Sequence, residues 1–292
     1  MSHQNLVRLY IGSVHKDYSG LNLFDWGSKT YLMGILNTTP DSFSNDGVYL
    51  DVDLAVEKGI QMLAHGADIL DVGGESNRPS SIYGEVDKIS VDEELDRVIP
   101  TIYALAKQAN CLLSIDTYKS KVAEAAIAAG AHMVNDIWGL SKDPEMATLI
   151  ADTGVYVVLM HNAEESEYGD VVSDTLDFLK AQVGFAVDNG IHQDKIIIDP
   201  GIGFSKGTTE NLEILNRLGE YKKIGLPLLV GTSRKATIGQ VLDLSVDDRI
   251  EGTAATVAVA ITRGADMVRV HDVKEMNRVS KMTDAIVRGD RH

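Results

Sequence analysis

Residues 31–47 read YLMGILNTTPDSFSNDG, an apolar run that changes into a polar loop at Asn37. The run is short and rich in large apolar side chains, which predicts a buried strand. The Thr, Pro, Asp, Ser and Gly residues after it predict a loop. An apolar run that ends in a polar residue recurs further along the chain. These further strands are predicted at residues 68–73, 111–116, 132–136, 155–161, 195–199, 227–233 and 266–271.

Ala-rich amphipathic segments that end in glycine separate most of the predicted strands, for example at residues 54–66, 119–130 and 253–264. Strands that are apolar on both faces and alternate with helices indicate a parallel sheet. Eight of them favour a closed (β/α)8 barrel, the TIM barrel fold, over an open sheet. Because no linker divides the 292 residues, we expect a single α/β barrel domain over residues 31–292, preceded by an N-terminal extension or hairpin over residues 1–30.

Cations gather at the ends of the last two predicted strands. Arg234 and Lys235 follow the seventh strand, and Arg269 and His271 end the eighth. The active site of such a barrel lies at the carboxyl ends of its strands, and barrel enzymes often bind phosphate after strands seven and eight. Arg269 and His271 are two residues apart and therefore share a strand face. The sequence thus predicts an anion site, and the Asp and Asn residues at the other strand ends suit a polar heterocycle.

Composition restricts the partners and the compartment. With 27 basic and 43 acidic residues the net charge is −16, which argues against nucleic acid or an anionic membrane as a partner. No apolar run approaches the about 18 residues of a membrane span, and no signal-peptide pattern opens the chain. The single cysteine, Cys111, lies in an apolar strand and is better explained as a core thiol than as a nucleophile. We therefore expect a cytoplasmic protein.

Taken singly, several strand-end residues also have a structural explanation. An Asp after a strand caps the next helix as readily as it does chemistry. His161, at the end of the fifth strand, is equally well explained as a core histidine. The stretch Gly201–Phe204 after the sixth strand is more informative, because its two glycines permit close backbone approach to a ligand and Phe204 offers a flat apolar face.

Several blocks of the sequence resemble dihydropteroate synthase, the folate-pathway enzyme, in the same order from about residue 31 to the C-terminus. They are Asn37–Ser44, Asp71–Ser76 followed by Arg78–Pro79, Asn135–Asp136, Leu159–His161, Asp199–Phe204, Ser233–Lys235 and Arg269–His271. The resemblance implies a transferase that condenses 6-hydroxymethyl-7,8-dihydropterin diphosphate with 4-aminobenzoate, giving 7,8-dihydropteroate and diphosphate. It also implies a Mg²⁺ ion and a homodimer.

The resemblance implies roles for individual residues. The pterin would be held by Asp116, Asn135, Met160, Asp199 and Lys235. The diphosphate would be bound by Arg78, Arg269 and His271, with Asn37 serving its Mg²⁺. The aminobenzoate side would be formed by Asn77, Pro79, Phe204, Lys235 and Ala236. The residues with the most direct part in catalysis would be Asp116, Lys235 and Arg78.

These residue types suit the implied reaction. Breaking a carbon–oxygen bond releases diphosphate and leaves a pterin methylene cation, which the aniline nitrogen then attacks. The cations and the metal stabilise the leaving group, and Asp116 stabilises the opposite charge. This dissociative path needs no covalent nucleophile, in agreement with a chain that offers no convincing Ser or Cys for that role.

Three positions depart from the family pattern. Asn45 stands where the family usually has an Asp that precedes Gly, Asn77 replaces Thr, and Ala236 replaces a Ser that helps to bind the aminobenzoate carboxylate. We hypothesise that pterin and diphosphate binding are intact, whereas aminobenzoate and the sulfonamides that mimic it are held differently or less tightly. Thr237 and the backbone N–H groups of the following helix remain as partners for the carboxylate.

Three other functions remain open. A catalytically silent homologue would bind pterin without releasing diphosphate. A pterin-dependent methyltransferase would share the barrel and the pterin pocket but has no use for the cations Arg78, Arg269 and His271. A metal-dependent barrel hydrolase would use His161 and His271, but the sequence lacks an HxH pair at an early strand.

Overall fold

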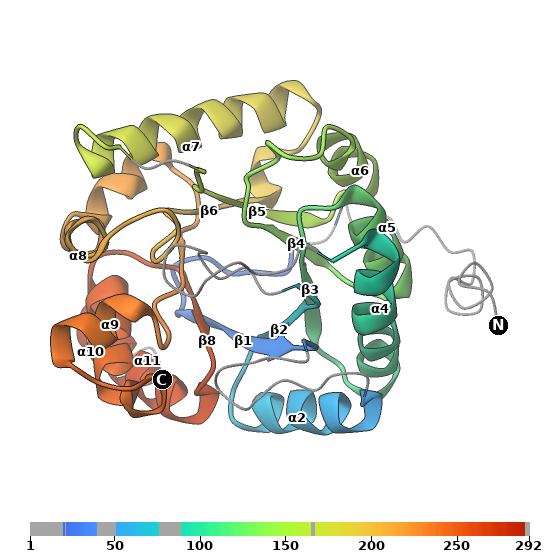
Figure 1. Ribbon diagram of the computed structural model, residues 1–292, viewed down its shortest axis with the longest axis horizontal. Coiled ribbons are helices and arrows are strands. Elements are labelled where there is room, and N and C mark those ends of the chain that lie inside the picture. Colours follow the sequence, from blue (N-terminus) through green and yellow to red (C-terminus); the bar gives the residue numbers. More distant parts are fainter. Residues whose placement is uncertain (1–19, 21, 40–50, 76–88, 165–166, 290–292) are drawn as a thin grey trace.

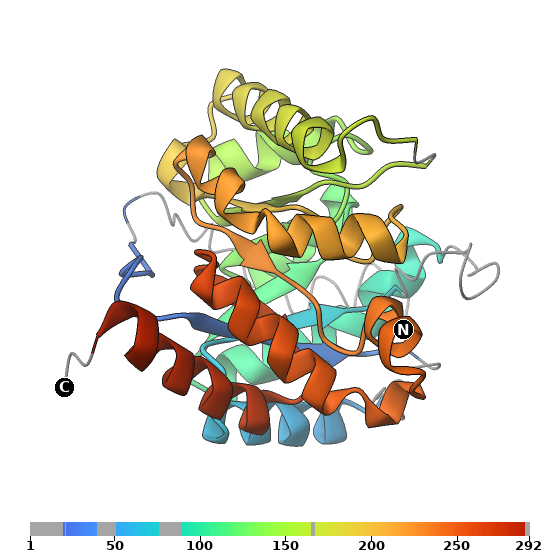
Figure 2. The same ribbon diagram turned by 90° about the vertical axis from the view of Figure 1, so that its left-hand side faces the viewer.

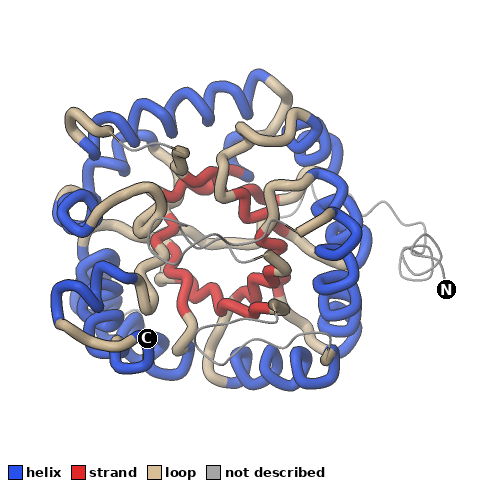
Figure 3. Tube along the Cα trace, in the orientation of Figure 1, coloured by secondary structure: helices blue, strands red, loops and turns tan. Residues whose placement is uncertain are grey.

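The computed structural model describes residues 20, 22–39, 51–75, 89–164 and 167–289. Eight parallel strands form one sheet in the hydrogen-bonded order β6-β5-β4-β3-β2-β1-β8-β7. They are β1 (Tyr31–Asn37), β2 (Ile69–Gly73), β3 (Leu112–Asp116), β4 (Met133–Asp136), β5 (Tyr156–Met160), β6 (Ile196–Asp199), β7 (Leu229–Val230) and β8 (Met267–Val270). Ile198 of β6 bridges Leu228, just before β7, which closes the sheet into a ring (Figure 3). The predicted (β/α)8 barrel and its eight strands are confirmed.

Helices form a layer around the outside of the ring (Figures 1 and 2). The α-helices are α2 (Val52–Ala64), α4 (Val91–Gln108), α5 (Ser120–Ala129), α6 (Glu145–Thr153), α7 (Val171–Asp188), α8 (Thr208–Asn216), α9 (Ala236–Leu242), α10 (Ile250–Thr262) and α11 (Val273–Arg288). Short 3-10 helices are η1 (Gln193–Lys195), η2 (Leu218–Ile224) and η3 (Val246–Asp248). Within the described residues, none of the helices combines the length and the apolar character that crossing a bilayer requires.

Local sequence explains where several helices begin and end. The Asp51 carboxylate accepts a hydrogen bond from Leu54 N at 2.9 Å, so α2 begins at Val52 rather than at the predicted residue 54. The Asp170 carboxylate accepts from Ser173 N at 2.8 Å and caps α7 in the same way. Helix α5 ends at Gly130, whose φ of 128° lies outside the range that other residues favour.

Side chains alternate between the two faces of each strand, as the pleat of a β-strand requires. On β1, Leu32 and Leu36 belong to the large core between the strands and the helices. Met33 instead points into the barrel, where it packs in a smaller apolar cluster that includes Ile69 and Met133. The interior of the barrel is therefore filled by apolar side chains at this level and becomes polar towards the carboxyl ends of the strands.

Aromatic side chains close the amino-terminal end of the barrel. Phe24 stacks on Trp26 at 4.5 Å between ring centroids and meets Tyr31 and Tyr156 edge-on at 5.0 Å each. The Tyr31 hydroxyl accepts a hydrogen bond from Asp25 N at 2.7 Å. The segment just before β1 thus plugs this end, while most of the predicted N-terminal hairpin lies outside the described residues.

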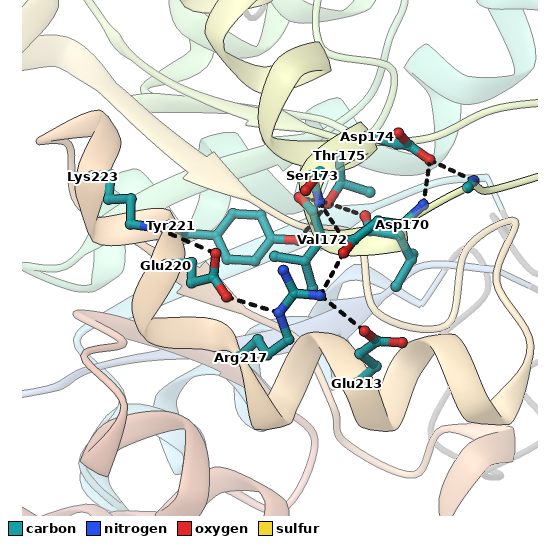
Figure 4. A network of polar contacts seen from close by, with 12 residues as sticks. Asp170, Val172, Ser173, Asp174, Thr175, Glu213, Arg217, Glu220, Tyr221 and Lys223 are labelled. Atoms are coloured by element: carbon teal, nitrogen blue, oxygen red, sulfur yellow. Dashed lines mark hydrogen bonds and ion pairs between the residues drawn. The ribbon is translucent and has the colours of Figure 1, made fainter.

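An ion-pair network on the outer surface joins α7 to the α8–η2 segment (Figure 4). The Arg217 guanidinium donates to Asp170 at 2.8 Å, to Glu213 at 2.9 Å and to Glu220 at 2.7 Å. Asp170 is also the N-cap of α7, so the network fixes the start of α7 against α8. These two helices follow β5 and β6, and the network therefore helps to place the loops at the ends of those strands.

Candidate active site

A row of residues in register crosses four neighbouring strands at their carboxyl ends. Asn37 pairs with Gly73, Gly73 with Asp116, and Asp116 with Asn135. Residues paired in register point to the same face, here the barrel interior. A Cβ atom added at Gly73 would lie 3.5 Å from Asp116 Cβ and 3.9 Å from Asn37 Oδ1. The glycine therefore leaves space between the Asn37 amide and the Asp116 carboxylate.

A buried hydrogen-bonded cluster, which we call the Asp71 cluster, comprises Asp71, Asp116, Asn135 and Arg269. Asp71 Oδ2 accepts from Arg269 Nε at 2.7 Å and from Asn135 Nδ2 at 3.0 Å. Arg269 Nη2 donates to Asp116 Oδ2 at 2.7 Å. Asp71 is fully buried, and the Arg269 side chain is 20% exposed. Side chains from β2, β3, β4 and β8 are thus held in one fixed arrangement.

Opposing effects act on the pKa values of the ionisable groups in the Asp71 cluster. Burial raises the pKa of Asp116 to about 7, Arg269 opposes this shift, and the carboxylate of Asp71 adds to it. Burial lowers the pKa of Arg269, but the Asp71 and Asp116 carboxylates outweigh it, so the net shift is upward and the guanidinium stays charged. Two carboxyl groups face one cation, and the cluster is net negative when both are ionised.

The opposite wall is formed by β5, β6 and the loop after β7. Met160 and Asp199 are paired in register at the ends of β5 and β6, and both are buried. Asp199 Oδ1 accepts from Gly201 N at 2.7 Å, and burial raises the pKa of this carboxyl to about 6. Lys235 Nζ lies 4.0 Å from the centroid of the Phe204 ring, a cation–π contact. This wall therefore combines charged, apolar and aromatic side chains.

The loop after β7 is bonded to the end of β8. Ser233 Oγ accepts from His271 N at 3.1 Å and lies 2.9 Å from His271 Nδ1, which fixes the orientation of the imidazole. Arg234 has a positive φ of 57° and makes two bonds to Asp272, at 3.0 and 2.6 Å. Of the four cations that the sequence groups together, Arg234 is thus neutralised locally by Asp272.

Most of the sequence-predicted residues come together at the carboxyl ends of the strands. They are Asn37, Asp116, Asn135, Met160, Asp199, Phe204, Lys235, Arg269 and His271. Ala236 is half-buried at the start of α9, directly after Lys235. Asn45, Asn77, Arg78 and Pro79 lie outside the described residues. Thr237 is buried, and its Oγ1 accepts from Asn211 Nδ2 of α8 at 3.0 Å.

Sequence reasoning missed two buried residues of this region. Asp71 lies inside the apolar stretch DILDVG, and a charged residue in such a stretch is a signal that could have identified it. No local pattern marks Lys206, yet its ammonium is buried and lies 2.9 Å from His161 Nδ1. His161 is thereby hydrogen-bonded as a core histidine, and burial lowers its pKa to about 3.

A metal centre built from protein side chains is not found in the part of the chain that the structure describes, since no three or more His, Cys, Asp or Glu residues gather there in a suitable group. Cys111 is half-buried away from these strand ends, and burial raises the pKa of its thiol to about 11. A thiol that stays protonated is a poor nucleophile.

Comparison with known proteins yields close relatives over most of the chain. Residues 33–271 match the pterin binding enzyme family. The dihydropteroate synthase of Clostridium beijerinckii is 50% identical over 92% of this chain and 98% of its own length. A crystal structure of the Clostridium difficile dihydropteroate synthase in the presence of pteroic acid is 47% identical, with a TM-score of 0.86 over 91% of this chain and 99% of that chain. The Xanthomonas albilineans enzyme with 4-aminobenzoic acid is 40% identical, with a TM-score of 0.83 over 89% and 94%.

A closed parallel barrel with carboxyl, amide and guanidinium groups buried at its strand ends defines a barrel enzyme that binds a polar ring. The chain belongs to the pterin binding enzyme family and, within it, to the dihydropteroate synthases, which are transferases. The resemblance drawn from the sequence motifs is confirmed. This membership favours a synthase over the methyltransferase and the hydrolase.

Gly203→Ala is expected to reduce synthase activity more than Gly225→Ala. A Cβ at Gly203 would lie 2.7 Å from Lys235 Cδ, so alanine there displaces Lys235 from Phe204. Gly225 has φ +81°, close to the +80° of Gly203, but an added Cβ would meet nothing within 4 Å. Both variants carry backbone strain of about 1–2 kcal/mol, and steady-state kinetics separate the clash from the strain. Equal activity losses in the two variants would contradict the expectation.

Proposed function

We propose that the protein condenses 6-hydroxymethyl-7,8-dihydropterin diphosphate with 4-aminobenzoate, giving 7,8-dihydropteroate and diphosphate. The observation that carries this proposal is the Asp71 cluster, which presents Asp116, Asn135 and Arg269 opposite Asp199 and Lys235. The relatives support it, since enzymes named dihydropteroate synthase have been crystallised with pteroic acid and with 4-aminobenzoic acid.

The pterin would lie between the two walls of this space. Its ring carries N–H donors and ring-nitrogen acceptors, which suit the Asp116 and Asp199 carboxyls, the Asn135 amide and the Lys235 ammonium. Met160 is buried in register with Asp199 and offers an apolar surface to the flat ring. The second substrate would lie on the Phe204 side, where the Lys235 ammonium lies 4.0 Å from the centroid of the Phe204 ring.

The diphosphate would be bound by Arg269 and His271 together with Arg78. A guanidinium has five N–H donors, and the two bonds of Arg269 to Asp71 and Asp116 use two of them. The His271 ring is already held in orientation by Ser233. A phosphate group placed here would meet charged donors on side chains that need little reorganisation.

Magnesium would accompany the diphosphate, with Asn37 as a protein ligand. A Cβ atom added at Gly73 would lie 3.9 Å from Asn37 Oδ1 and 3.7 Å from Asp116 Oδ2. Two oxygen donors therefore border the space that the glycine leaves open. Mg²⁺ prefers oxygen and usually takes one or two protein ligands, the remainder being phosphate oxygens and water. The residues present therefore fit this ion, which when bound neutralises charge on the leaving diphosphate.

The reaction would proceed by dissociation. The carbon–oxygen bond breaks, its electron pair leaves with the diphosphate, and a methylene cation remains on the pterin. Asp116 and Asp71 supply negative charge beside this cation, while Arg269 faces the departing anion. The aniline nitrogen then forms the new carbon–nitrogen bond and loses a proton. Asp116, Lys235 and Arg78 would contribute most directly to this sequence.

The proposal includes a homodimer, which the family resemblance implies, and a cytoplasmic location, which the composition of the chain predicts. A single half-buried cysteine suits a reducing compartment. Sedimentation velocity of the purified protein tests the dimer, and a monomer at assay concentrations would contradict it.

Diphosphate release by the purified protein tests the proposed function. The protein is incubated with dihydropterin diphosphate and Mg²⁺, with and without 4-aminobenzoate, while dihydropteroate formation is followed. Product that requires both substrates is the expected result. Tight pterin binding without any product would instead identify the silent homologue, the second candidate that the departures at Asn45, Asn77 and Ala236 leave open.

Ala236→Ser is expected to lower both the KM for 4-aminobenzoate and the inhibition constant of a sulfonamide. A hydroxyl directly after Lys235 would donate one hydrogen bond to the carboxylate, worth about 1.5–3 kcal/mol or about tenfold to a hundredfold in affinity. Thr237, the next residue, is buried and its hydroxyl oxygen already accepts from Asn211 Nδ2. The KM for the pterin diphosphate serves as internal control. If neither aminobenzoate KM nor sulfonamide inhibition changes, the hypothesis about Ala236 is wrong.

A further inference from the structure

Lys206, which follows the loop after β6, places its ammonium inside the protein. The residue is 6% exposed. Its Nζ donates to Gly201 O and to Phe204 O, each at 3.0 Å, and lies 2.9 Å from His161 Nδ1 and 3.4 Å from His161 O. The three shorter contacts match the three N–H donors of an ammonium group. Lys206 thus ties the end of β5, at His161, to the loop after β6.

Burying the Lys206 ammonium costs free energy. Burial lowers the pKa of Lys206 to about 7, while the Asp199 carboxylate opposes that shift. Burial lowers the pKa of His161 to about 3, and since an ammonium can only donate, Nδ1 of the neutral imidazole is the acceptor in this hydrogen bond. Removing the ammonium would leave two carbonyl groups and one imidazole nitrogen without this partner in the interior, which is more destabilising than the loss of an average hydrogen bond.

The loop that Lys206 holds has an unusual backbone. Gly201, Gly203 and Ser205 have φ values of 71°, 80° and 47°, so three of five successive residues are left-handed. Such conformations persist only where the surroundings hold them. Lys206 binds the carbonyls of Gly201 and Phe204 in this stretch, and Asn211 Oδ1 accepts from Gly203 N, between these two residues, at 2.8 Å.

The same loop presents Phe204 to the candidate active site. The Phe204 carbonyl is bound by Lys206, whereas its ring faces Lys235 Nζ at 4.0 Å. We propose that Lys206 is a positioning residue for the second substrate, because it fixes the backbone that sets the Phe204 ring against Lys235. This inference rests on the proposed function, in which Phe204 and Lys235 flank the aminobenzoate. Lys206 itself touches neither substrate.

Lys206→Met tests the proposal against Lys195→Met. Lys195 is also a buried lysine, but it lies at the opposite end of β6, with Nζ 4.5 Å from the Tyr156 ring centroid. For Lys206→Met we expect the KM for 4-aminobenzoate to rise about tenfold, the effect of losing one to two hydrogen bonds. The KM for the pterin diphosphate should change less than about twofold. For Lys195→Met both KM values should stay near those of the wild type.

A second variant, His161→Phe, tests the proposal if the Lys206→Met protein does not fold. His161→Phe removes one of the three acceptors and places an aromatic ring beside Phe178, which already contacts the imidazole edge-on at 4.8 Å. It should raise the same KM by a smaller factor. Equal increases in both KM values, or a fall in kcat alone, in folded Lys206→Met or His161→Phe protein would overturn the proposal.

Amide hydrogen exchange supplies a readout that does not need activity. Phe204 N donates to Gly201 O at 3.1 Å, and we expect its exchange to accelerate in Lys206→Met but not in Lys195→Met. Unchanged exchange at Phe204 in an active Lys206→Met protein would overturn the Lys206 proposal alone. A wild-type protein that forms no dihydropteroate would overturn the proposed function, and with it the aminobenzoate role of Lys206.

Discussion

Arg269→Met is expected to lower the free energy of unfolding by about 3–5 kcal/mol at pH 8, the usual effect of removing one partner of a buried ion pair. Arg269 is bonded to both Asp71, which is fully buried, and Asp116. Methionine fills much of the same volume but leaves two carboxyl groups facing each other in the interior. Urea unfolding of the wild type and the variant measures the loss.

The pH dependence of this loss has a definite sign. Burial holds the pKa of Asp116 at about 7, well above the ordinary aspartate value of 3.8. A carboxyl whose folded pKa is raised takes up a proton more readily in the folded state, so lowering the pH relieves the repulsion left in Arg269→Met. Because Arg269 opposes the rise in pKa, its loss raises the pKa of Asp116 further, so the deficit should grow as the pH rises above 7 and be smallest below pH 7.

Two further variants make this result specific to the Asp71 cluster. Asp71→Asn in the Arg269→Met background removes one buried charge and should restore stability by about 0.5–3 kcal/mol, the range of coupling between contacting residues. It should not restore turnover, because the cation for the diphosphate is still missing.

Arg234→Met is the matched control. The Arg234 side chain is also 20% exposed, but it pairs with Asp272, which is 16% exposed and can be hydrated. Equal losses in Arg234→Met and Arg269→Met would contradict the importance of the cluster.

The sequence could predict which strand ends carry the site but not which side chains pair there. The spacing of Arg269 and His271 placed both on one strand face. Arg234 had the same local signal as Arg269, yet its positive φ and its bonds to Asp272 direct it elsewhere. That difference depends on the closure of the barrel, which no local pattern encodes.

Long-range pairing explains the residues that sequence reasoning missed. Asp71 and Arg269 are 198 positions apart in the sequence. They meet because β2 and β8 are separated by a single strand, β1, in the ring. Lys206 and His161 are 45 positions apart and meet through the pairing of β5 with β6. A buried charge looks improbable from sequence alone, since lysine and aspartate are usually exposed. Only the partner makes each of them stable inside the protein.

Asp116→Asn is expected to lower kcat by about 10²–10³-fold, the usual effect of removing one group that stabilises transition-state charge. Asparagine keeps an oxygen that can accept from Arg269 Nη2, so the Asp71 cluster should persist. The negative charge opposite the developing methylene cation is lost, and this charge matters more in the transition state than in the bound substrate. The KM for the pterin diphosphate should therefore change much less than kcat, which steady-state kinetics would show.

Asp136→Asn is the matched control for Asp116→Asn. Asp136 is a neighbouring buried carboxyl whose pKa burial raises to about 6, but it pairs in register with Leu159 and accepts from Trp138 N and Leu140 N at 2.8 and 2.9 Å. It therefore belongs to a turn on the outer side of the barrel. Its variant should lose stability while keeping kcat within a few-fold of the wild type. A comparable fall in kcat for both variants would contradict the role of Asp116.

The wild-type pH profile distinguishes catalysis by the Asp116 carboxylate from a structural role. Since burial raises the pKa of Asp116 to about 7, the charged form needed for catalysis is lost as the pH falls through 7, and kcat should fall with it. The effect of Asp116 on the free energy of unfolding has the opposite sign. Because the pKa of Asp116 is higher in the folded state, the free energy of unfolding decreases as the pH rises from about 4 to 7. Activity and stability should therefore respond to this one group with opposite signs. In Asp116→Asn the acid limb of the kcat profile should disappear, and an unchanged limb would show that another group controls it.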